Sequence, residues 1–327
     1  MIREKNKKNK FFIVIYIFLV IIFLCPLPYY IEKDGGLIST ADRVKIENTS
    51  SSNNFYMAYV SEIKVNIFTY IISLFNKDWT LIPKKDVVYT NETEAEEKFR
   101  SKLLLNESID NAIISAFKLA NKNINIKSEE YYVTYIDETA KTDMKIQDKI
   151  IKINNIDIKS KEDIKNIIKN LKPGDSISID VINNEKTYKR TAKLIDIDGQ
   201  SVIGVLLTSK KEIETIPKIT NEFKNSESGS SGGLMLALEI YNNLTDNDIS
   251  KGRKIAGTGT IDENGNIGQI SGVKYKLKGA YKEGATVFLV PSGENYEIAI
   301  KVAAEEKLNI EILEVSTLKD AIIKLEG

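Results

Sequence analysis

A serine framed by glycines is the residue in this sequence best suited to nucleophilic chemistry. Ser231 lies within Gly229-Ser230-Ser231-Gly232-Gly233, just before an apolar segment that predicts a helix. Glycines allow a sharp turn and let a substrate backbone approach closely. The first N–H groups of the following helix are free to stabilise an oxyanion. The segment therefore predicts an acyl-transfer nucleophile, although residues 225–233 also have the composition of a flexible linker.

The base that activates this serine cannot be a histidine, because the chain has none. This absence excludes Ser-His-Asp catalysis, including the G-x-S-x-G hydrolases whose pattern Gly229, Ser231 and Gly233 otherwise match. It also excludes histidine-ligated zinc. The single cysteine, Cys25, excludes a disulfide within the chain and argues against a cysteine nucleophile. The base must then be a lysine, a carboxylate or an N-terminal amine.

Lys274 is the predicted base. It follows the apolar approach Ile270-Ser271-Gly272-Val273 at the start of a predicted helix. A lysine amine accepts a proton only when neutral, and burial lowers its pKa from about 10.4 by penalising the charged form. The dipole at a helix N-terminus also disfavours a positive charge. A solvated surface lysine is the alternative interpretation, since most lysines are exposed.

The charge balance argues against nucleic-acid binding. Among the 327 residues, Lys+Arg and Asp+Glu both number 46, so the formal net charge is zero and no basic footprint is present. The sequence contains no G-x-x-x-x-G-K-[ST] phosphate loop, so ATP-driven unfolding is not encoded. We expect no cofactor, no metal, no ATP and no nucleic acid as partner.

The N-terminus predicts a membrane anchor. Four lysines between residues 5 and 10 precede an apolar run, and Phe11–Ile31 as a helix would span about 30 Å, enough for one crossing. The lysines predict a cytoplasmic tail at residues 1–10, with the remaining chain outside the cell membrane. A cleaved signal peptide is the alternative, but Pro26–Tyr30 lacks a small-x-small cleavage site.

Residues 32–122 predict a folded extracytoplasmic segment of mixed type without chemistry of its own. Ile63–Phe75 is too short and too polar to cross a membrane and predicts a core helix. Helical patterns occupy residues 94–105 and 109–121, the second with Ser108 as its cap.

Residues 123–208 predict a separate α+β module. Strand patterns at Tyr131–Tyr135 and Ile146–Ile156 precede a helix capped by Ser160, and Ile177–Val181 alternates as a further strand. Met144–Asn155 resembles the PDZ signature Leu-x-x-Gly-Asp-x-Ile-x-x-Ile-Asn-Gly. The resemblance implies a PDZ-like domain and binding of peptide C-termini by strand addition. Gln147 and Asn155 stand where that family prefers glycine, and a small α+β spacer is the alternative.

Residues 209–327 alternate helix and strand, which predicts an α/β domain. The predicted order is helix 232–244, hairpin 255–270 with a turn at Asn264-Gly265, helix 273–283, strand 286–290, helix 294–307, strand 309–314 and helix 317–325.

Two segments resemble the Lon-type serine proteases. Gly229–Met235 resembles their Gly-Pro-Ser-Ala-Gly-Leu/Ile segment, and Thr258–Lys274 resembles Thr-Gly-x-Ile … Gly-x-Val-x-x-Ile-Gly-Gly-Leu/Val-Lys. The resemblance places the nucleophile at Ser231 and the lysine base at Lys274, 43 residues apart. The whole chain resembles bacterial membrane-anchored, PDZ-containing Lon-like proteases.

The sequence departs from the Lon-type pattern at three positions. Ser230 replaces proline, which leaves Ser230 as a second candidate nucleophile, while Gly232 replaces alanine and Ser271 replaces glycine. We expect Gly229, Gly232 and Gly233 to support the catalytic loop and the oxyanion. The resemblance implies that Thr258 holds the lysine, and a purely structural strand role is the alternative.

The resemblance implies an ATP-independent serine endopeptidase with a Ser-Lys dyad, which cleaves exposed peptides or flexible segments outside the membrane. It is compatible with a homo-oligomer, since Lon-type domains often form rings. Two rival hypotheses remain at this point. One is a membrane-anchored PDZ binding protein with an inactive Lon-like domain. The other is an unrelated Ser-Lys amidase or signal-peptidase-like enzyme.

Overall fold

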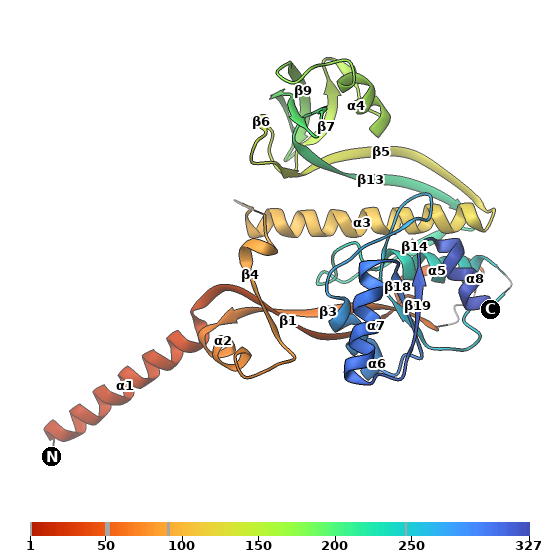
Figure 1. Cartoon of the computed structure of the whole chain (residues 1–327). Helices are drawn as coiled ribbons and strands as arrows, with labels where there is room; N and C mark the ends of the chain where they lie inside the picture. Colours follow the sequence, from red (N-terminus) through yellow and green to blue (C-terminus); the bar gives the residue numbers. More distant parts are fainter. Residues whose placement is uncertain (1, 50–52, 90–91, 246) are drawn as a thin grey trace.

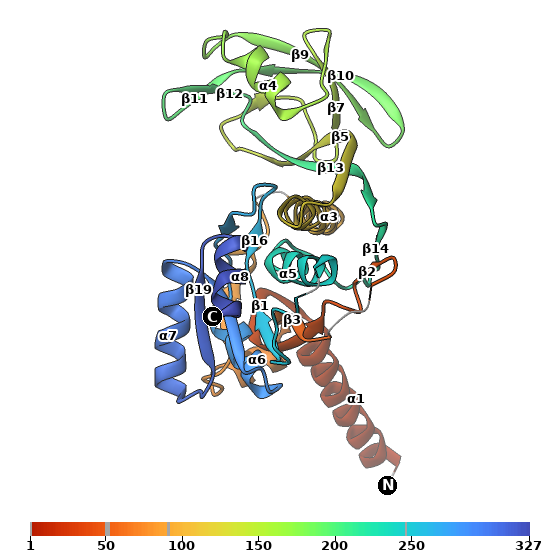
Figure 2. The same ribbon diagram turned by 90° about the vertical axis from the view of Figure 1, so that its right-hand side faces the viewer.

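The structure is a computed structural model that describes residues 2–49, 53–89, 92–245 and 247–327, with side chains described from residue 9 onward. It is a mixed α/β protein with two main sheets (Figure 1). A long helix, α3 (Glu94–Leu119), lies between the two parts that contain these sheets, as Figures 1 and 2 both show.

The first sheet is built from both ends of the chain. Its order is β19 (Glu311–Val315), β18 (Val287–Pro291), β15 (Ile255–Gly257), β3 (Phe55–Asn66), β1 (Pro26–Ser39) and β4 (Thr80–Pro83). The strands pair in parallel from β19 to β3, whereas β1 pairs antiparallel with both β3 and β4. Residues 32–122 contribute β3, β4 and most of β1 to this sheet, which they share with strands of the C-terminal domain.

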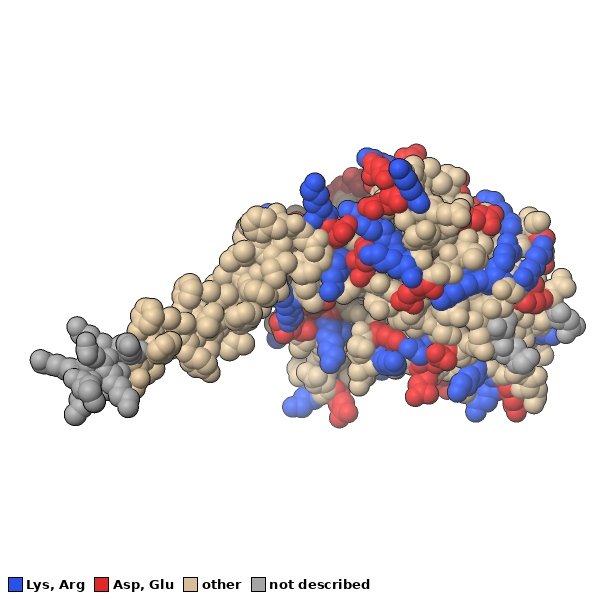
Figure 3. Space-filling view, turned by 90° about the horizontal axis from the view of Figure 1, so that it is seen from below, with Lys and Arg blue, Asp and Glu red and all other residues tan. Residues whose placement is uncertain are grey.

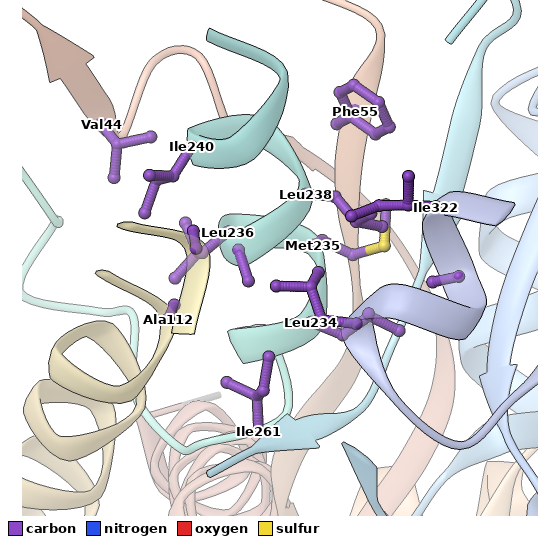
Figure 4. Close-up of a cluster of buried hydrophobic side chains, with 14 of the residues drawn as sticks. Val44, Phe55, Ala112, Leu234, Met235, Leu236, Leu238, Ile240, Ile261 and Ile322 are labelled. Carbon is purple, nitrogen blue, oxygen red and sulfur yellow. The ribbon is translucent and has the colours of Figure 1, made fainter. Parts of the chain in front are cut away.

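Helices cover both faces of this sheet. One core cluster joins α3, α5 (Gly233–Leu244) and α8 (Leu318–Glu326), and the other joins α6 (Val273–Lys282) and α7 (Glu294–Glu306). Helix α5 is buried on nearly every side, as Figure 4 shows for its leucines, because it lies between the sheet and α3. Two short ribbons complete the domain: β2 (Val44–Ile46) with β14 (Ile219–Asn221), and β16 (Thr260–Ile261) with β17 (Ile267–Gly268).

The second sheet forms the module predicted from residues 123–208. Its order is β13 (Val205–Ile216), β5 (Asn123–Ile136), β7 (Lys149–Ile153), β9 (Ser176–Asn183), β10 (Lys186–Lys193) and β6 (Lys141–Thr142). Three shorter strands accompany it: β8 (Ile156–Asp157), β11 (Ile195–Ile197) and β12 (Gln200–Val202). The predicted helix is present as α4 (Lys161–Ile168), and Ser160 caps it in a capping box with Asp163.

A long two-stranded arm, made of β5 and β13, carries this module and lies along α3 (Figure 1). Carboxylates of α3 satisfy the free edge of β13: Glu107 Oε1 accepts from Ser209 N–H at 3.0 Å, and Asp110 Oδ2 accepts from Lys211 N–H at 2.9 Å. Edge N–H groups that would otherwise recruit another strand are thus paired.

The partly buried carboxyl of Asp110 should make the stability of the protein depend on pH. Burial raises the pKa of its carboxyl from 3.8 to about 6. The resulting contribution to stability is fully present below pH 3.8 and is lost as the pH rises through 6, because only the folded chain is protonated within that window. We expect Asp110→Asn, whose amide oxygen still accepts from Lys211, to raise the free energy of unfolding at pH 7 by up to about 3 kcal/mol.

Urea unfolding of both chains at pH 7.5 and pH 5 measures this difference. The gap between Asp110→Asn and the parent should shrink toward pH 5. A gap of equal size at both pH values contradicts the prediction.

The N-terminal helix, α1 (Ile2–Leu24), ends earlier than the predicted Phe11–Ile31 span. Pro26 lacks the N–H that a helix requires and restricts the residue before it, so the chain continues as β1 instead. Tyr30 and Ile31 are buried in the sheet. Figure 3 shows the part of α1 whose side chains are described as a projection with almost no charge, while both charge signs are interspersed over the body.

The lysine side chains at positions 5, 7 and 8, on which the expected orientation depends, lie outside the described residues. In the part of the chain that the structure describes, no helix has the length and apolar character required to cross a membrane.

Two further helix predictions are corrected. Residues 63–66 extend β3, and only α2 (Ile67–Ser73) is helical; it buries none of its residues and so is no core helix. The predicted break at Ser108 is absent, because α3 runs continuously through this residue. Its N-cap is Thr93, which forms a capping box with Glu96. One turn of 3₁₀ helix, η1 (Lys84–Asp86), precedes α3.

Candidate active site

The glycines around Ser231 are required by close contacts. Gly229 has a φ of +85°, in the left-handed region that glycine adopts without strain. A Cβ atom on Gly232 would lie 2.5 Å from Met57 Sδ, and one on Gly233 would lie 2.6 Å from Ser108 Oγ. The Ser231 loop is therefore packed against its neighbours, which excludes the linker interpretation of this segment.

Ser231 immediately precedes α5, with Gly232 as the N-cap of that helix. Its carbonyl oxygen accepts from Gly259 N–H at 2.8 Å and from Thr258 Oγ1 at 3.1 Å. The N–H groups of Ser231 and Gly232 donate no hydrogen bond to any group that the structure describes. They are thus available to a negatively charged oxygen of a bound substrate.

The buried lysine beside this loop is Lys276. Its Nζ donates to Thr258 Oγ1 at 3.2 Å, and the residue is only 5% exposed. Burial lowers the pKa of Lys276 to about 8, while the negative charge of Glu32 acts in the opposite direction. The Thr258 hydroxyl therefore connects the two residues, because it accepts from the Lys276 amine and donates to the Ser231 carbonyl.

Lys274, the base predicted from the sequence, is not the lysine that contacts Thr258, and its role as base stays a prediction. Residues two apart on a helix point about 200° away from each other, so Lys274 and Lys276 cannot face the same site. Lys274 is half-buried, and its Nζ lies 5.4 Å from the centre of the Tyr275 ring. Its charge acts on Asp78, whose side chain is 61% exposed. Lys274 therefore lies toward the surface.

The sequence held a signal for Lys276 that our prediction missed. Val273, Leu277 and Ala280 form the buried face of α6. With Lys276 they complete the spacing i, i+3, i+4, i+7 that marks one side of a helix. Lys274 does not fit this spacing. Helical periodicity therefore predicts which of the two lysines is buried, whereas the apolar residues that precede the helix do not.

Two acidic side chains lie beside the same region. Glu32 of β1 and Glu62 of β3 are cross-strand partners. Burial raises the pKa of both carboxyls, and the positive charge of Lys276 lowers that of Glu32. Sequence analysis assigned Glu32 no role, because its proximity to Lys276 depends on β1 packing against α6, a contact between the two ends of the chain.

A groove of about 720 Å³ opens at Ser231. Its lining comes from residues 37–39 of β1, residues 57–62 of β3 and the loop between residues 223 and 232. Leu37, Met57 and Phe223 supply apolar surface, and Arg43 and Glu62 supply charges of opposite sign. The groove is large enough for several residues of an extended chain.

Comparison with known proteins identifies residues 222–325 as a match to the Lon protease (S16) C-terminal proteolytic domain. The Lon protease of Campylobacter jejuni is 34% identical over 95 residues, which are 29% of this chain and 12% of the relative. That of Endomicrobium trichonymphae is 24% identical over 163 residues, 46% of this chain and 20% of the relative. The chain thus spans at most a fifth of these relatives' length.

Solved PDZ domains are similar to about a quarter of the chain. The PDZ domain of the SdrC-like protein from Listeria monocytogenes is 24% identical, with a TM-score of 0.22, over 24% of this chain and 85% of that one. The PDZ domain of the SdrC-like protein from Listeria innocua is 27% identical, with a TM-score of 0.23, over 24% of this chain and 92% of that one.

Proposed function

We propose that this chain is a serine endopeptidase with Ser231 as nucleophile and Lys276 as general base. The observation that carries the proposal is the buried amine of Lys276, hydrogen-bonded to Thr258 Oγ1, which in turn donates to the Ser231 carbonyl. A lysine that loses its proton near pH 8 matches the task of a base at physiological pH. The match of residues 222–325 to a Lon proteolytic domain supports the same reaction class.

The proposed reaction proceeds through an acyl-enzyme. Neutral Lys276 takes the proton of Ser231 Oγ as that oxygen attacks the peptide carbonyl, and then gives this proton to the leaving amine. The free N–H groups of Ser231 and Gly232 stabilise the tetrahedral oxyanion. Lys276 next takes a proton from a water molecule that attacks the acyl group, and gives this proton to Ser231 Oγ as the acid product leaves. Thr258 keeps the amine in place throughout.

The substrate is an exposed peptide or an unfolded segment that lies in the groove at Ser231. The chain contains no phosphate-binding loop, so the proposed reaction needs no ATP, and only chains that are already unfolded enter. We assign recruitment of such peptides to the PDZ-like module by strand addition. Calorimetric titration with the C-terminal peptides of cleaved substrates tests this role, and absence of binding heat contradicts it.

The exposed apolar side chains of α1 support membrane attachment, and we propose that the groove lies outside the cell. Phe11, Phe18 and Leu24 are each more than 60% exposed, and such a surface in water is costly unless something covers it. Alkaline extraction of membranes tests the attachment, because a peripherally bound chain is released into the supernatant. Protease protection of intact cells tests the side.

Cleavage of unfolded casein by the full-length chain, purified in detergent without nucleotide, tests the proposed function. We expect fragments to accumulate at the same rate with and without ATP. A fluorophosphonate probe should label Ser231, which peptide mass mapping locates. No cleavage together with no labelling contradicts the proposal, and cleavage only with ATP contradicts its ATP independence.

Activity should rise with pH and level off above the pKa of Lys276, because only its neutral form accepts a proton. We therefore expect kcat/KM to show an acidic limb with a midpoint near pH 8. Glu32→Gln removes the negative charge that favours the ammonium, so its midpoint should lie at a lower pH. A pH series on a fluorogenic peptide measures both profiles. An unmoved midpoint argues that Glu32 does not act on Lys276.

A further inference from the structure

Helix α3 holds the loop that leads into Ser231. The backbone carbonyl of Ser101 accepts from Gly229 N–H at 3.0 Å. The Lys102 ammonium donates to the carbonyls of Lys224 and Glu227, at 2.9 and 2.6 Å. Helix α3 ends before residue 222, so it lies outside the segment that matches the Lon proteolytic domain. The catalytic loop thus depends on a part of the chain to which the comparisons assign no role.

Among the hydrogen bonds between α3 and the loop, the one made by Ser108 lies nearest in sequence to Ser231. This residue is 4% exposed, and its Oγ donates to the carbonyl oxygen of Ser230 at 2.9 Å. Serine hydroxyls inside helices commonly bond back to a carbonyl of their own helix. Ser115 of α3 does so, with Ala112 O at 3.2 Å. Ser108 instead donates to a carbonyl outside its own helix, so helix formation alone does not account for this bond.

Ser108 Oγ and, at 3.3 Å, Gly233 N–H both donate to the Ser230 carbonyl and so fix one peptide plane of the catalytic loop. Because the peptide unit is planar and trans, the carbonyl of Ser230 and the N–H of Ser231 point in opposite directions. Holding that carbonyl therefore sets the direction of the Ser231 N–H, one of the two unpaired donors beside the nucleophile. The second donor, Gly232 N–H, is oriented in the same way by the bonds that Thr258 and Gly259 make to the Ser231 carbonyl.

We propose that Ser108 is a positioning residue for the oxyanion donors, acting through the Ser230–Ser231 peptide. The inference rests on the proposed peptidase function. Helix α3 is a suitable support, because the same turn is also held by the arm and by β16. Glu107 and Asp110 accept from β13 of the arm, and Asn111 Nδ2 donates to Ile261 O of β16 at 3.1 Å. The turn that carries Ser108 is therefore held from two elements before a substrate arrives.

Kinetics of Ser108→Ala, Ser108→Thr and Ser115→Ala in the full-length chain test the proposal. Loss of a whole oxyanion donor costs about 10²–10³ in kcat, so a donor that is only misaligned should cost about 10-fold. We expect this loss in Ser108→Ala with KM within about twofold of the parent, since the ground state does not use the donor. Ser108→Thr keeps a hydroxyl and should recover most of kcat. Ser115→Ala, an equally buried serine of the same helix, should match the parent.

Hydrogen exchange gives a readout that does not require activity. We expect amides 229–233 to exchange faster in Ser108→Ala than in Ser115→Ala, with α5 unchanged. If these amides loosen but the parent chain cleaves no peptide, the proposed function fails and the positioning role stands. If the parent is active and Ser108→Ala keeps its kcat, or loses activity only by unfolding as thermal melts show, the positioning role is overturned.

Discussion

Replacing Lys276 with methionine is expected to lower kcat at pH 8 by about 10³-fold or more, whereas Lys274→Met should stay within about threefold of the parent. General-base catalysis contributes about 10²–10⁴, and methionine cannot accept the proton of Ser231. Methionine also fills the space of a lysine stem, so the buried Lys276 site remains packed. The two variants carry the same substitution two residues apart on one helix, which makes each a control for the other.

Initial rates on a fluorogenic peptide and thermal melts of all three chains measure this prediction. Lys276→Met should melt at or above the parent temperature, because its buried amine costs desolvation energy. An active Lys276→Met chain together with an inactive, folded Lys274→Met chain restores Lys274 as the base.

Ser231→Ala is expected to lower kcat by about 10⁴-fold or more, because no acyl-enzyme can form without the hydroxyl. Ser230→Ala should remain active within a few-fold. Its contribution to the loop is the backbone carbonyl that accepts from Ser108, and alanine retains that carbonyl. Comparing these two variants therefore decides which of the two adjacent serines is the nucleophile.

Casein cleavage and fluorophosphonate labelling measure both variants. Only Ser231→Ala should lose the label. Loss of the label in Ser230→Ala, with Ser231→Ala still labelled, identifies Ser230 as the nucleophile.

Local patterns predicted the elements of the C-terminal third well. Strands β18 and β19 and helices α5 to α8 lie where apolar periodicity and turn residues placed them, within a few residues. In the module of residues 123–208, Ser160 caps its helix and Asn154 and Asn155 turn with positive φ, as expected for Asn in tight turns. These features depend on neighbours in sequence, which a reader of the sequence sees directly.

Features that depend on distant parts of the chain were missed. The pairing of β3 with β15 joins Phe55 to Ile255, and no local pattern indicates it. The role of Ser108 was misread for the same reason, because its partner Ser230 lies 122 residues away. The burial of Lys276 was missed for a different reason, because we considered the approach to the helix and not the face on which each lysine lies.

The shared sheet has a consequence for synthesis. Strand β3 leaves the ribosome about 200 residues before β15, its parallel partner, so a growing chain carries an unfinished sheet for most of its translation. The arm and its module are complete earlier, since β5 and β13 both precede residue 217. Ser231 and Lys276 are held in place only once β15 and α6 have joined β3. The order of the strands thus delays assembly of the proposed site until nearly the whole chain has been made.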